Sequence, residues 1–130
     1  MAHSLISNSK FDIESAIRAV ETGYPGVQPV LAELVEWLQD CNWPVAQVLS
    51  PFLAGIGLPL VPCIDHVFLT NDETWKYWMI VCLISQNDDL FNYYKPRLIE
   101  YATNSSENDR HYELVEISRE TLSEHGYFDD

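Results

Sequence analysis

The amino-acid sequence predicts an all-α fold in which about three helix pairs stack one after another. Apolar residues recur at the spacing of an α-helix along almost the whole chain, and no segment shows the two-residue alternation of a half-buried strand. Three prolines, Pro29, Pro62 and Pro96, lie early in successive helical segments, 33 and 34 residues apart. A period of this length with two helices per unit is typical of a helical-repeat protein.

The chain, 130 residues long, has the length of one domain and enough apolar residues to form its own core. We expect residues 1–130 to form a single helical-repeat domain. Within it, residues 1–10 form an N-terminal extension, residues 11–122 the repeat core and residues 123–130 an acidic tail.

The first predicted helix begins near Asp12 and ends at Gly23, where Gly23, Pro25 and Gly26 supply the end of the helix and the turn after it. Its apolar residues are Ile13, Ala16, Ile17 and Val20. We expect this short helix to cap the stack.

Two amphipathic helices about three turns long are predicted next, over residues 27–38 and 45–56, with apolar residues at identical offsets. After a Gly- and Pro-containing break, a further helix is expected over residues 60–68. Pro29 and Pro62 fit the first turn of their helices, where the missing N–H needs no partner.

The second half of the chain predicts three more helices, over residues 75–85, 88–104 and about 111–122. Thr70, Asn71 and Asp72 are candidate N-caps for the first of these, and Glu73 stands in capping-box spacing to Thr70. Pro96 lies deep in the second, so we expect a kinked helix there rather than two short ones. The whole corresponds to a short right-handed stack resembling HEAT or armadillo repeats, with about three repeats and seven helices.

The charge is the most informative bulk property. Seven Lys and Arg residues stand against twenty Asp and Glu residues, which gives a net charge of −13. Such a field repels nucleic acid and anionic lipid and attracts a basic partner, although it also serves solubility alone. No apolar run is long enough for a membrane span and the first ten residues do not form a signal peptide, so a cytoplasmic protein is expected. We also expect a monomer, because an acidic surface disfavours self-association.

The three cysteines, Cys41, Cys63 and Cys82, are odd in number and widely spaced, and we expect them to be free thiols in the core. Cys63 and His66 have the spacing of metal ligands on one helix face, but no third or fourth ligand is evident. No nucleophile with a nearby base and no nucleotide-binding or metalloprotease motif occurs. The sequence therefore predicts no catalytic residue, no metal and no cofactor.

Two kinds of residue are candidates for a protein-binding surface. Glu33, Glu36 and Asp40 form a carboxylate row opposite the apolar stripe of their helix, which is either a plain solvated face or part of a face for a basic partner. Trp37 and Tyr77 are candidate aromatic anchors, whereas Trp43 and Trp78 are expected in the core. The predicted contact residues are Glu33, Glu36, Trp37, Asp40, Asp72, Glu73 and Tyr77.

Four blocks of sequence resemble a bacterial family, domain of unknown function 5071. They are KFDIE at residues 10–14, EWLQD at 36–40, NWPVA at 42–46 and WKYW at 75–78, and the resemblance runs from about residue 10 to residue 122. It implies a HEAT-like helical fold and a possible role as an immunity protein beside a secreted toxin. It implies no catalytic residues.

These observations favour a non-enzymatic protein-binding module, more sharply a cytoplasmic immunity protein that neutralises a basic bacterial toxin. A scaffold or adaptor that binds a peptide on its concave surface is the alternative, and the sequence does not separate the two. A small hydrolase that uses the surface carboxylates is the third hypothesis.

Overall fold

The computed structural model describes residues 5–103 and 109–127, and these residues form helices without any β-strand. The α-helices are α1 (Ile13–Thr22), α2 (Leu31–Glu36), α3 (Pro44–Ile56), α4 (Val61–Phe68), α5 (Glu73–Cys82), α6 (Asp88–Thr103) and α7 (Asp109–Glu124). Short 3-10 helices connect them: η2 (Gln28–Val30), η3 (Trp37–Gln39), η4 (Leu58–Leu60) and η5 (Ile84–Gln86). The prediction of an all-α fold is confirmed.

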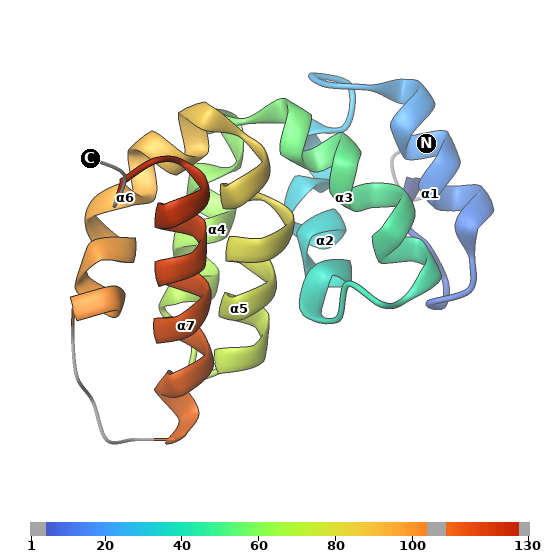
Figure 1. Ribbon diagram of the computed structural model, residues 1–130. Coiled ribbons are helices and arrows are strands. Elements are labelled where there is room, and N and C mark those ends of the chain that lie inside the picture. The colour runs from blue at the N-terminus through green and yellow to red at the C-terminus, as the bar shows by residue number, and fades with distance from the viewer. Residues whose placement is uncertain (1–4, 104–108, 128–130) are drawn as a thin grey trace.

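The helices follow one another across the molecule from one end to the other. Helix α1 forms one end and packs on α3, whereas α6 and α7 lie side by side at the other end, with α5 next to α7 (Figure 1). Helices α2 and α4 contact each other behind α3 and α5 in the view of Figure 1. Grooves can therefore form between helices on both faces.

Helix α1 begins and ends where the sequence predicts. The Asp12 carboxylate accepts hydrogen bonds from the Ser15 backbone N–H at 3.3 Å and the Ser15 hydroxyl at 2.8 Å, and Gly23 ends the helix with φ of 74°. The preceding segment is tied to the domain, because the Val45 N–H donates to the Lys10 carbonyl at 3.1 Å. Leu5 and Ile6, in the segment predicted as an extension, also pack against the core.

The prediction of one three-turn helix over residues 27–38 is wrong. The chain forms η2, a six-residue α2 and η3 in succession, and Leu38 inside η3 has non-helical backbone angles. Asp40 is then extended, with φ of −148° and ψ of 105°. A continuous apolar stripe persists through these tighter turns, so its spacing alone does not reveal the break.

The three prolines that suggested a regular period do not hold equivalent positions. Pro29 lies in η2 and Pro62 in the first turn of α4, but Pro96 lies inside α6. Pro59, in η4, is the structural counterpart of Pro29, because each lies in a 3-10 turn that leads directly into a helix. Helix α6 remains a single helix across Pro96, so the prediction of one helix rather than two short ones is confirmed.

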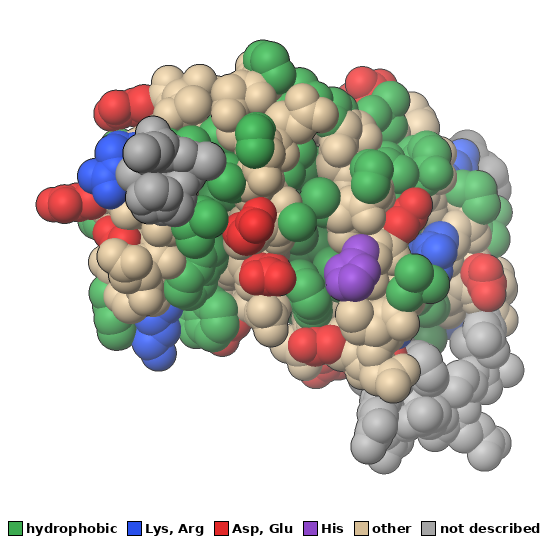
Figure 2. All heavy atoms as spheres, turned by 180° about the vertical axis from the view of Figure 1, so that it is seen from behind, with side chains coloured by type: hydrophobic (Ala, Val, Ile, Leu, Met, Phe, Trp, Pro, Cys, Tyr) green, Lys and Arg blue, Asp and Glu red, His purple; other side chains and the backbone are tan. Residues whose placement is uncertain are grey.

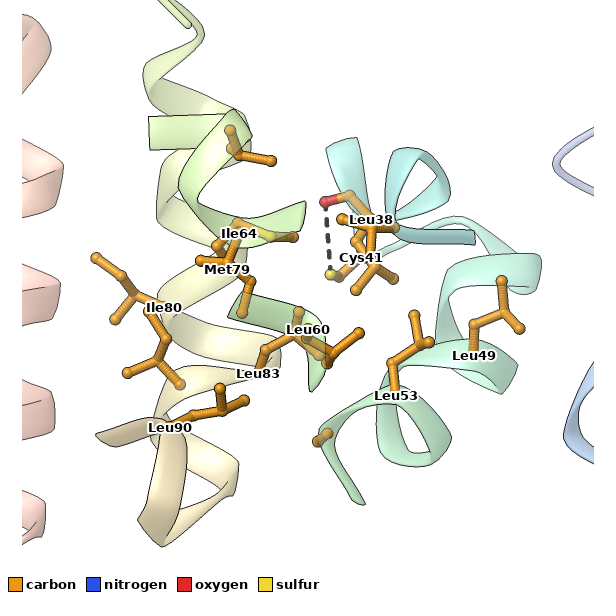
Figure 3. Close-up of a cluster of buried hydrophobic side chains, with 14 of the residues drawn as sticks. Leu38, Cys41, Leu49, Leu53, Leu60, Ile64, Met79, Ile80, Leu83 and Leu90 are labelled. Atoms are coloured by element: carbon orange, nitrogen blue, oxygen red, sulfur yellow. Dashed lines mark hydrogen bonds between the residues drawn. The ribbon is translucent and has the colours of Figure 1, made fainter. Parts of the chain in front are cut away.

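The core is one continuous cluster that all the helices share. Figure 3 shows its centre, where side chains from η3, α3, η4, α4, α5 and α6 converge. The fully buried residues labelled there are Leu38, Leu49, Leu53, Leu60, Ile64, Met79, Ile80, Leu83 and Leu90. Each such side chain contributes roughly 1.5–3 kcal/mol by leaving water, and this is the main force that holds the helices together.

No single helix among the described residues is long and apolar enough to cross a membrane. Helix α3 with the η4–α4 segment meets the criteria of length and composition only as a pair bent by 112°. Both halves of that pair contribute fully buried residues to the core, including Leu49 and Ile64.

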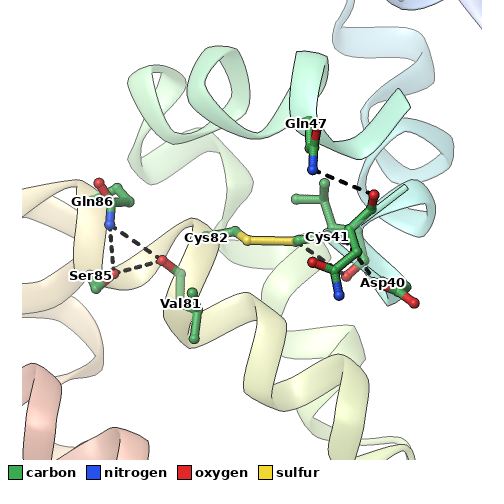
Figure 4. The surroundings of a disulfide bond; sticks show 9 residues. Asp40, Cys41, Gln47, Val81, Cys82, Ser85 and Gln86 are labelled. Carbon is green, nitrogen blue, oxygen red and sulfur yellow. Dashed lines mark hydrogen bonds between the residues drawn. A yellow bond between two sulfur atoms is a disulfide. The ribbon is translucent and has the colours of Figure 1, made fainter. Parts of the chain in front are cut away.

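The prediction of three free core thiols is wrong for two of the cysteines. Cys41, just after η3, and Cys82, at the end of α5, form a disulfide, and their Cα atoms are 7.3 Å apart (Figure 4). These residues are 41 positions apart in sequence and meet because η3 packs on α5, a contact that sequence spacing does not reveal. Cys63 is a free, half-buried thiol.

Candidate functional site

A first cavity lies between α2 and α4 and has a volume of about 370 Å³. Its lining residues come from α2, α4 and α5 and are Ala32, Val35, Glu36, Pro62, Cys63, His66 and Trp75. We call it the α2–α4 pocket. The face seen in Figure 2 carries carboxylates and a histidine among apolar side chains.

Cys63 and His66 are the two groups in the α2–α4 pocket that could carry chemistry. Burial raises the pKa of the Cys63 thiol, and the negative charge of Glu33 raises it further. A thiol in this environment stays protonated near neutral pH, the opposite of what a nucleophilic cysteine needs. No group of three His, Cys, Asp or Glu side chains in the described part of the chain could hold a metal ion.

A second cavity lies between α5 and α7 and has a volume of about 410 Å³. We call it the α5–α7 groove. Its lining residues are Thr74, Tyr77 and Trp78 of α5 and Glu113, Glu116, Ile117 and Glu120 of α7. The two helices are in direct contact and lie side by side in Figure 1.

The α5–α7 groove combines aromatic rings with carboxylates. The rings of Tyr77 and Trp78 pack edge to face, with centroids 5.1 Å apart, and both side chains are half-buried. Glu113, Glu116 and Glu120 lie on one side of α7 because helix residues three, four and seven apart share a face. A cation that enters this groove would meet aromatic faces and negative charge together, the combination that binds Lys and Arg side chains.

The structure does not preserve the predicted carboxylate row of Glu33, Glu36 and Asp40. Glu33 and Glu36 are exposed on α2, and Glu36 lines the α2–α4 pocket. Asp40 leaves the row because the helix ends before it, and its carboxylate accepts a hydrogen bond from the Asn42 N–H at 2.9 Å. Asp40 therefore stabilises the turn before α3.

The aromatic candidates divide between the core and the surface. Trp37 is half-buried, and its ring lies edge-on to Trp43 with centroids 5.9 Å apart, so it packs at a joint rather than at a free edge. Trp43 packs against the core as predicted. Trp78 also contacts the core but lines the α5–α7 groove beside Tyr77.

Asp72 and Glu73 have structural contacts instead of lining either cavity. Asp72 is the N-cap of α5, and its carboxylate accepts a hydrogen bond from the Trp75 N–H at 3.0 Å. Glu73 forms an ion pair with Lys76 at 3.0 Å, and the two side chains are 20% and 9% exposed. The predicted capping box of Thr70 and Glu73 is therefore not formed, since Asp72 holds the cap position.

Several cations whose side chains the structure describes make contacts within the chain. Lys10, Lys95 and Arg97 lie over the rings of Phe11, Tyr127 and Phe68, at 5.3, 5.1 and 4.5 Å from the centroids. Arg119 donates a hydrogen bond to the Ala102 carbonyl at 3.0 Å. Among the described residues that line the α5–α7 groove, none is Lys or Arg.

A family model described as a domain of unknown function, DUF5071, matches residues 5–122, which is most of the chain. No curated protein matches it.

Proposed function

The chain belongs to the DUF5071 family, and we propose that it is a non-enzymatic protein-binding module whose partner is basic. The α5–α7 groove is the single observation that carries this proposal. Three glutamates on one face of α7 stand opposite Tyr77 and Trp78 of α5. A Lys or Arg side chain of the partner would insert between them and exchange its hydration for carboxylate and ring contacts.

The charge of the whole molecule supports the same partner. The net charge of −13 steers a basic protein towards the surface and speeds association at low ionic strength. The same field opposes nucleic acid and anionic membranes as partners.

For the scaffold we propose a short, right-handed HEAT-like stack. Helices α2 and α3, α4 and α5, and α6 and α7 would form its three pairs, with α1 beside the first pair. The contacts of α3 with α5 and of α5 with α7 support one layer, and the contact of α2 with α4 supports the other. In such a stack, the extended concave surface formed by one layer of helices is the usual binding surface.

The sharper form of the proposal is a cytoplasmic immunity protein that neutralises a basic bacterial toxin. In that compartment Cys41 and Cys82 would be kept as thiols, and the disulfide would form on oxidation. Small size, an acidic surface and a groove for cationic side chains support it, because an acidic inhibitor can cover a basic active site. An adaptor that binds a basic peptide would use the same groove. A hydrolase has no observation in its favour, since Glu33 and Glu36 are exposed to water and the Cys63 thiol is held protonated.

Growth protection tests the immunity proposal. We expect the neighbouring gene in the native genome to encode a toxin with a basic C-terminal domain, and co-expression of this chain to restore growth. The variant Glu113→Gln/Glu116→Gln/Glu120→Gln should lose protection by at least tenfold in plating efficiency. The control Glu14→Gln/Glu21→Gln/Asp89→Asn removes the same charge from exposed positions elsewhere and should protect fully.

Two results would count against this account. Equal loss in both triple variants would show that net charge, and not the groove, confers protection. A toxin that the wild-type chain does not neutralise would remove the immunity function, and binding of the groove to a basic peptide would then favour the adaptor.

A further inference from the structure

A further cavity lies between α3 and the end of α5, beside the disulfide, and has a volume of about 430 Å³. We call it the α3–α5 pocket. Its lining residues are Ser50, Pro51, Ala54 and Gly55 of α3, Val81 and Cys82 of α5 and Gln86 of η5. Of the two cysteines that form the bridge, Cys82 lines this pocket, whereas Cys41 is not among its lining residues.

The two bridged cysteines differ in their access to solvent. Cys82 is half-buried, whereas Cys41 is only 9% exposed and belongs to the core cluster. Figure 4 shows the bridge between the end of α5 and the segment that follows η3. A small molecule that enters the α3–α5 pocket therefore meets Cys82 and not Cys41.

The chain that follows Cys82 is held by hydrogen bonds that do not involve either sulfur atom. The Ser85 hydroxyl donates to the Val81 carbonyl at 2.7 Å, and the Gln86 amide donates to the Ser85 hydroxyl at 3.1 Å (Figure 4). These contacts remain when the bridge opens, so Gln86 stays at the edge of the pocket in both forms of the cysteine pair.

We propose that the sulfur of Cys82 is a thiol–disulfide exchange site, where a small thiol opens the bridge to Cys41 and a small disulfide closes it. In the opening step the thiolate of the small molecule attacks the Cys82 sulfur. A new S–S bond forms there, and the electron pair of the old bond leaves on Cys41, which takes up a proton. A second small thiol then releases Cys82 as a thiol and departs in a small disulfide. The protein is reduced by two electrons and two small thiols are oxidised; closing runs the same steps in reverse.

The opened form has a place for the thiol that leaves. The sulfur of Cys41 lies 3.9 Å from the Leu38 carbonyl, which accepts the S–H of the thiol form (Figure 3). Cys41 therefore stays beside Cys82 and can close the bridge again. Because the bridge links η3 to α5, the balance of thiol and disulfide in the surroundings sets the stability of the fold.

The lining of the α3–α5 pocket determines which small thiols and disulfides suit it. None of the described residues that line it is charged, and Ser50 and Gln86 supply only neutral polar groups. The whole chain carries a net charge of −13, which repels anions. The reagent class that fits this site is therefore a small thiol or disulfide without negative charge.

Trapping of the mixed disulfide tests which sulfur is attacked. The folded, bridged Cys63→Ala chain is exposed briefly to 2-mercaptoethanol and quenched with excess N-ethylmaleimide, and its peptides are mapped by mass spectrometry. The mercaptoethanol adduct should be on Cys82 and the maleimide on Cys41, in about tenfold excess over the reverse pattern. An equal distribution, or an adduct mainly on Cys41, would overturn the proposal.

Two variants with one cysteine each measure the same difference in access without an intermediate. Cys41→Ser/Cys63→Ala retains Cys82, and Cys82→Ser/Cys63→Ala retains Cys41. With uncharged 2-hydroxyethyl disulfide the folded first variant should react about tenfold faster than the folded second, and in urea the two should react equally. Circular dichroism checks that both are folded, and equal rates in the folded variants would refute the assignment.

The reagent and the folded state provide the last two controls. Relative to its rate in urea, the anionic 3,3′-dithiodipropionate should react with folded Cys82 about fivefold more slowly than 2-hydroxyethyl disulfide; equal relative rates would exclude the proposed reagent class. Opening of the bridge in Cys63→Ala should change little in low urea. A rate that rises in proportion to the unfolded fraction would show that only the unfolded chain reacts. Neither bridged cysteine lines the α5–α7 groove, so this proposal and the proposed function fail separately.

Discussion

The hydroxyl group of Tyr94 donates a hydrogen bond to the Asp65 carboxylate over 2.8 Å and thereby joins α6 to α4. The same hydroxyl lies 3.2 Å from the Val61 carbonyl, which shares this single proton as a second, longer acceptor. Tyr94 is almost fully buried, and its ring packs against Phe68, with centroids 5.7 Å apart. This contact fixes the last two helices, and with them the α7 side of the groove, relative to the rest of the stack.

We expect Tyr94→Phe to lower the free energy of unfolding by about 1–2 kcal/mol, because a buried hydrogen bond to a charged group is lost while the ring remains. Urea unfolding followed by circular dichroism measures this. The control is Tyr93→Phe, whose ring is 53% exposed, and its stability should change by less than about 0.5 kcal/mol. Equal stability of all three proteins would contradict the role of this hydrogen bond.

Ionisation of the Tyr94 hydroxyl should make the folded chain less stable at alkaline pH. Burial, followed by the hydrogen bond to Asp65, raises the pKa of Tyr94 well above its ordinary value of 10.0. The folded chain therefore holds the phenol proton more tightly than the unfolded chain, so this contribution to stability is complete below pH 10 and falls as the pH rises above it. Urea unfolding between pH 8 and 11 should show a steeper decline for wild-type than for Tyr94→Phe, and parallel declines would exclude the effect.

Substitutions at Glu73 and Glu120 should have opposite effects on the stability of the fold and on the affinity for a basic ligand. Glu73→Gln leaves the mostly buried Lys76 without its ion pair and should lower the free energy of unfolding by about 1–3 kcal/mol, with affinity for a basic ligand unchanged. Glu120→Gln should have the reverse effect, since Glu120 is exposed on the groove. Thermal unfolding together with calorimetric titration of an arginine-rich peptide measures both, and weaker binding by Glu73→Gln would refute the assignment.

The pairing of the cysteines predicts the thiol chemistry of the native chain. Alkylation of the unfolded, unreduced protein followed by mass spectrometry should modify Cys63 alone, and reduction should release Cys41 and Cys82. Because the bridge closes a loop of 41 positions, reduction should cost about 3–4 kcal/mol of stability. Three alkylated cysteines without reduction, in protein purified under oxidising conditions, would show that the bridge is absent.

Local signals in the sequence predict much of the fold. Asp12 and Gly23 mark the ends of α1, and the helical spacing predicts α3, α6 and α7 within a few residues. The predictions fail where contacts between distant parts of the chain determine which residues are buried. Spacing cannot show that the small residues Ala16 and Ala19 face α3 while Ile17 faces outward, because all three belong to one broad apolar arc.

The sequence pointed to carboxylate rows and aromatic residues as the components of a binding surface, but it did not show which helices carry them. The offsets 0, 3 and 7 that singled out Glu33, Glu36 and Asp40 also occur in α7, at Glu113, Glu116 and Glu120. Only the second set lies on a continuous helix, since α2 ends at Glu36. Tyr77, predicted only as a candidate aromatic anchor, lines the α5–α7 groove. The other helix of this groove comes from more than thirty residues later in the chain, and no local pattern reveals that contact.

The most direct test of the central claim, that the α5–α7 groove binds cationic side chains, is an NMR titration of the isotope-labelled chain with N-acetyl-arginine-amide. The account predicts amide shifts concentrated at Thr74, Tyr77, Trp78 and Ile117, with an affinity on the order of 1 mM. The glutamate analogue should cause none, and the triple glutamine variant of α7 should bind at least tenfold more weakly. Shifts that are absent, equal in the triple variant, or centred on the α2–α4 pocket would contradict it.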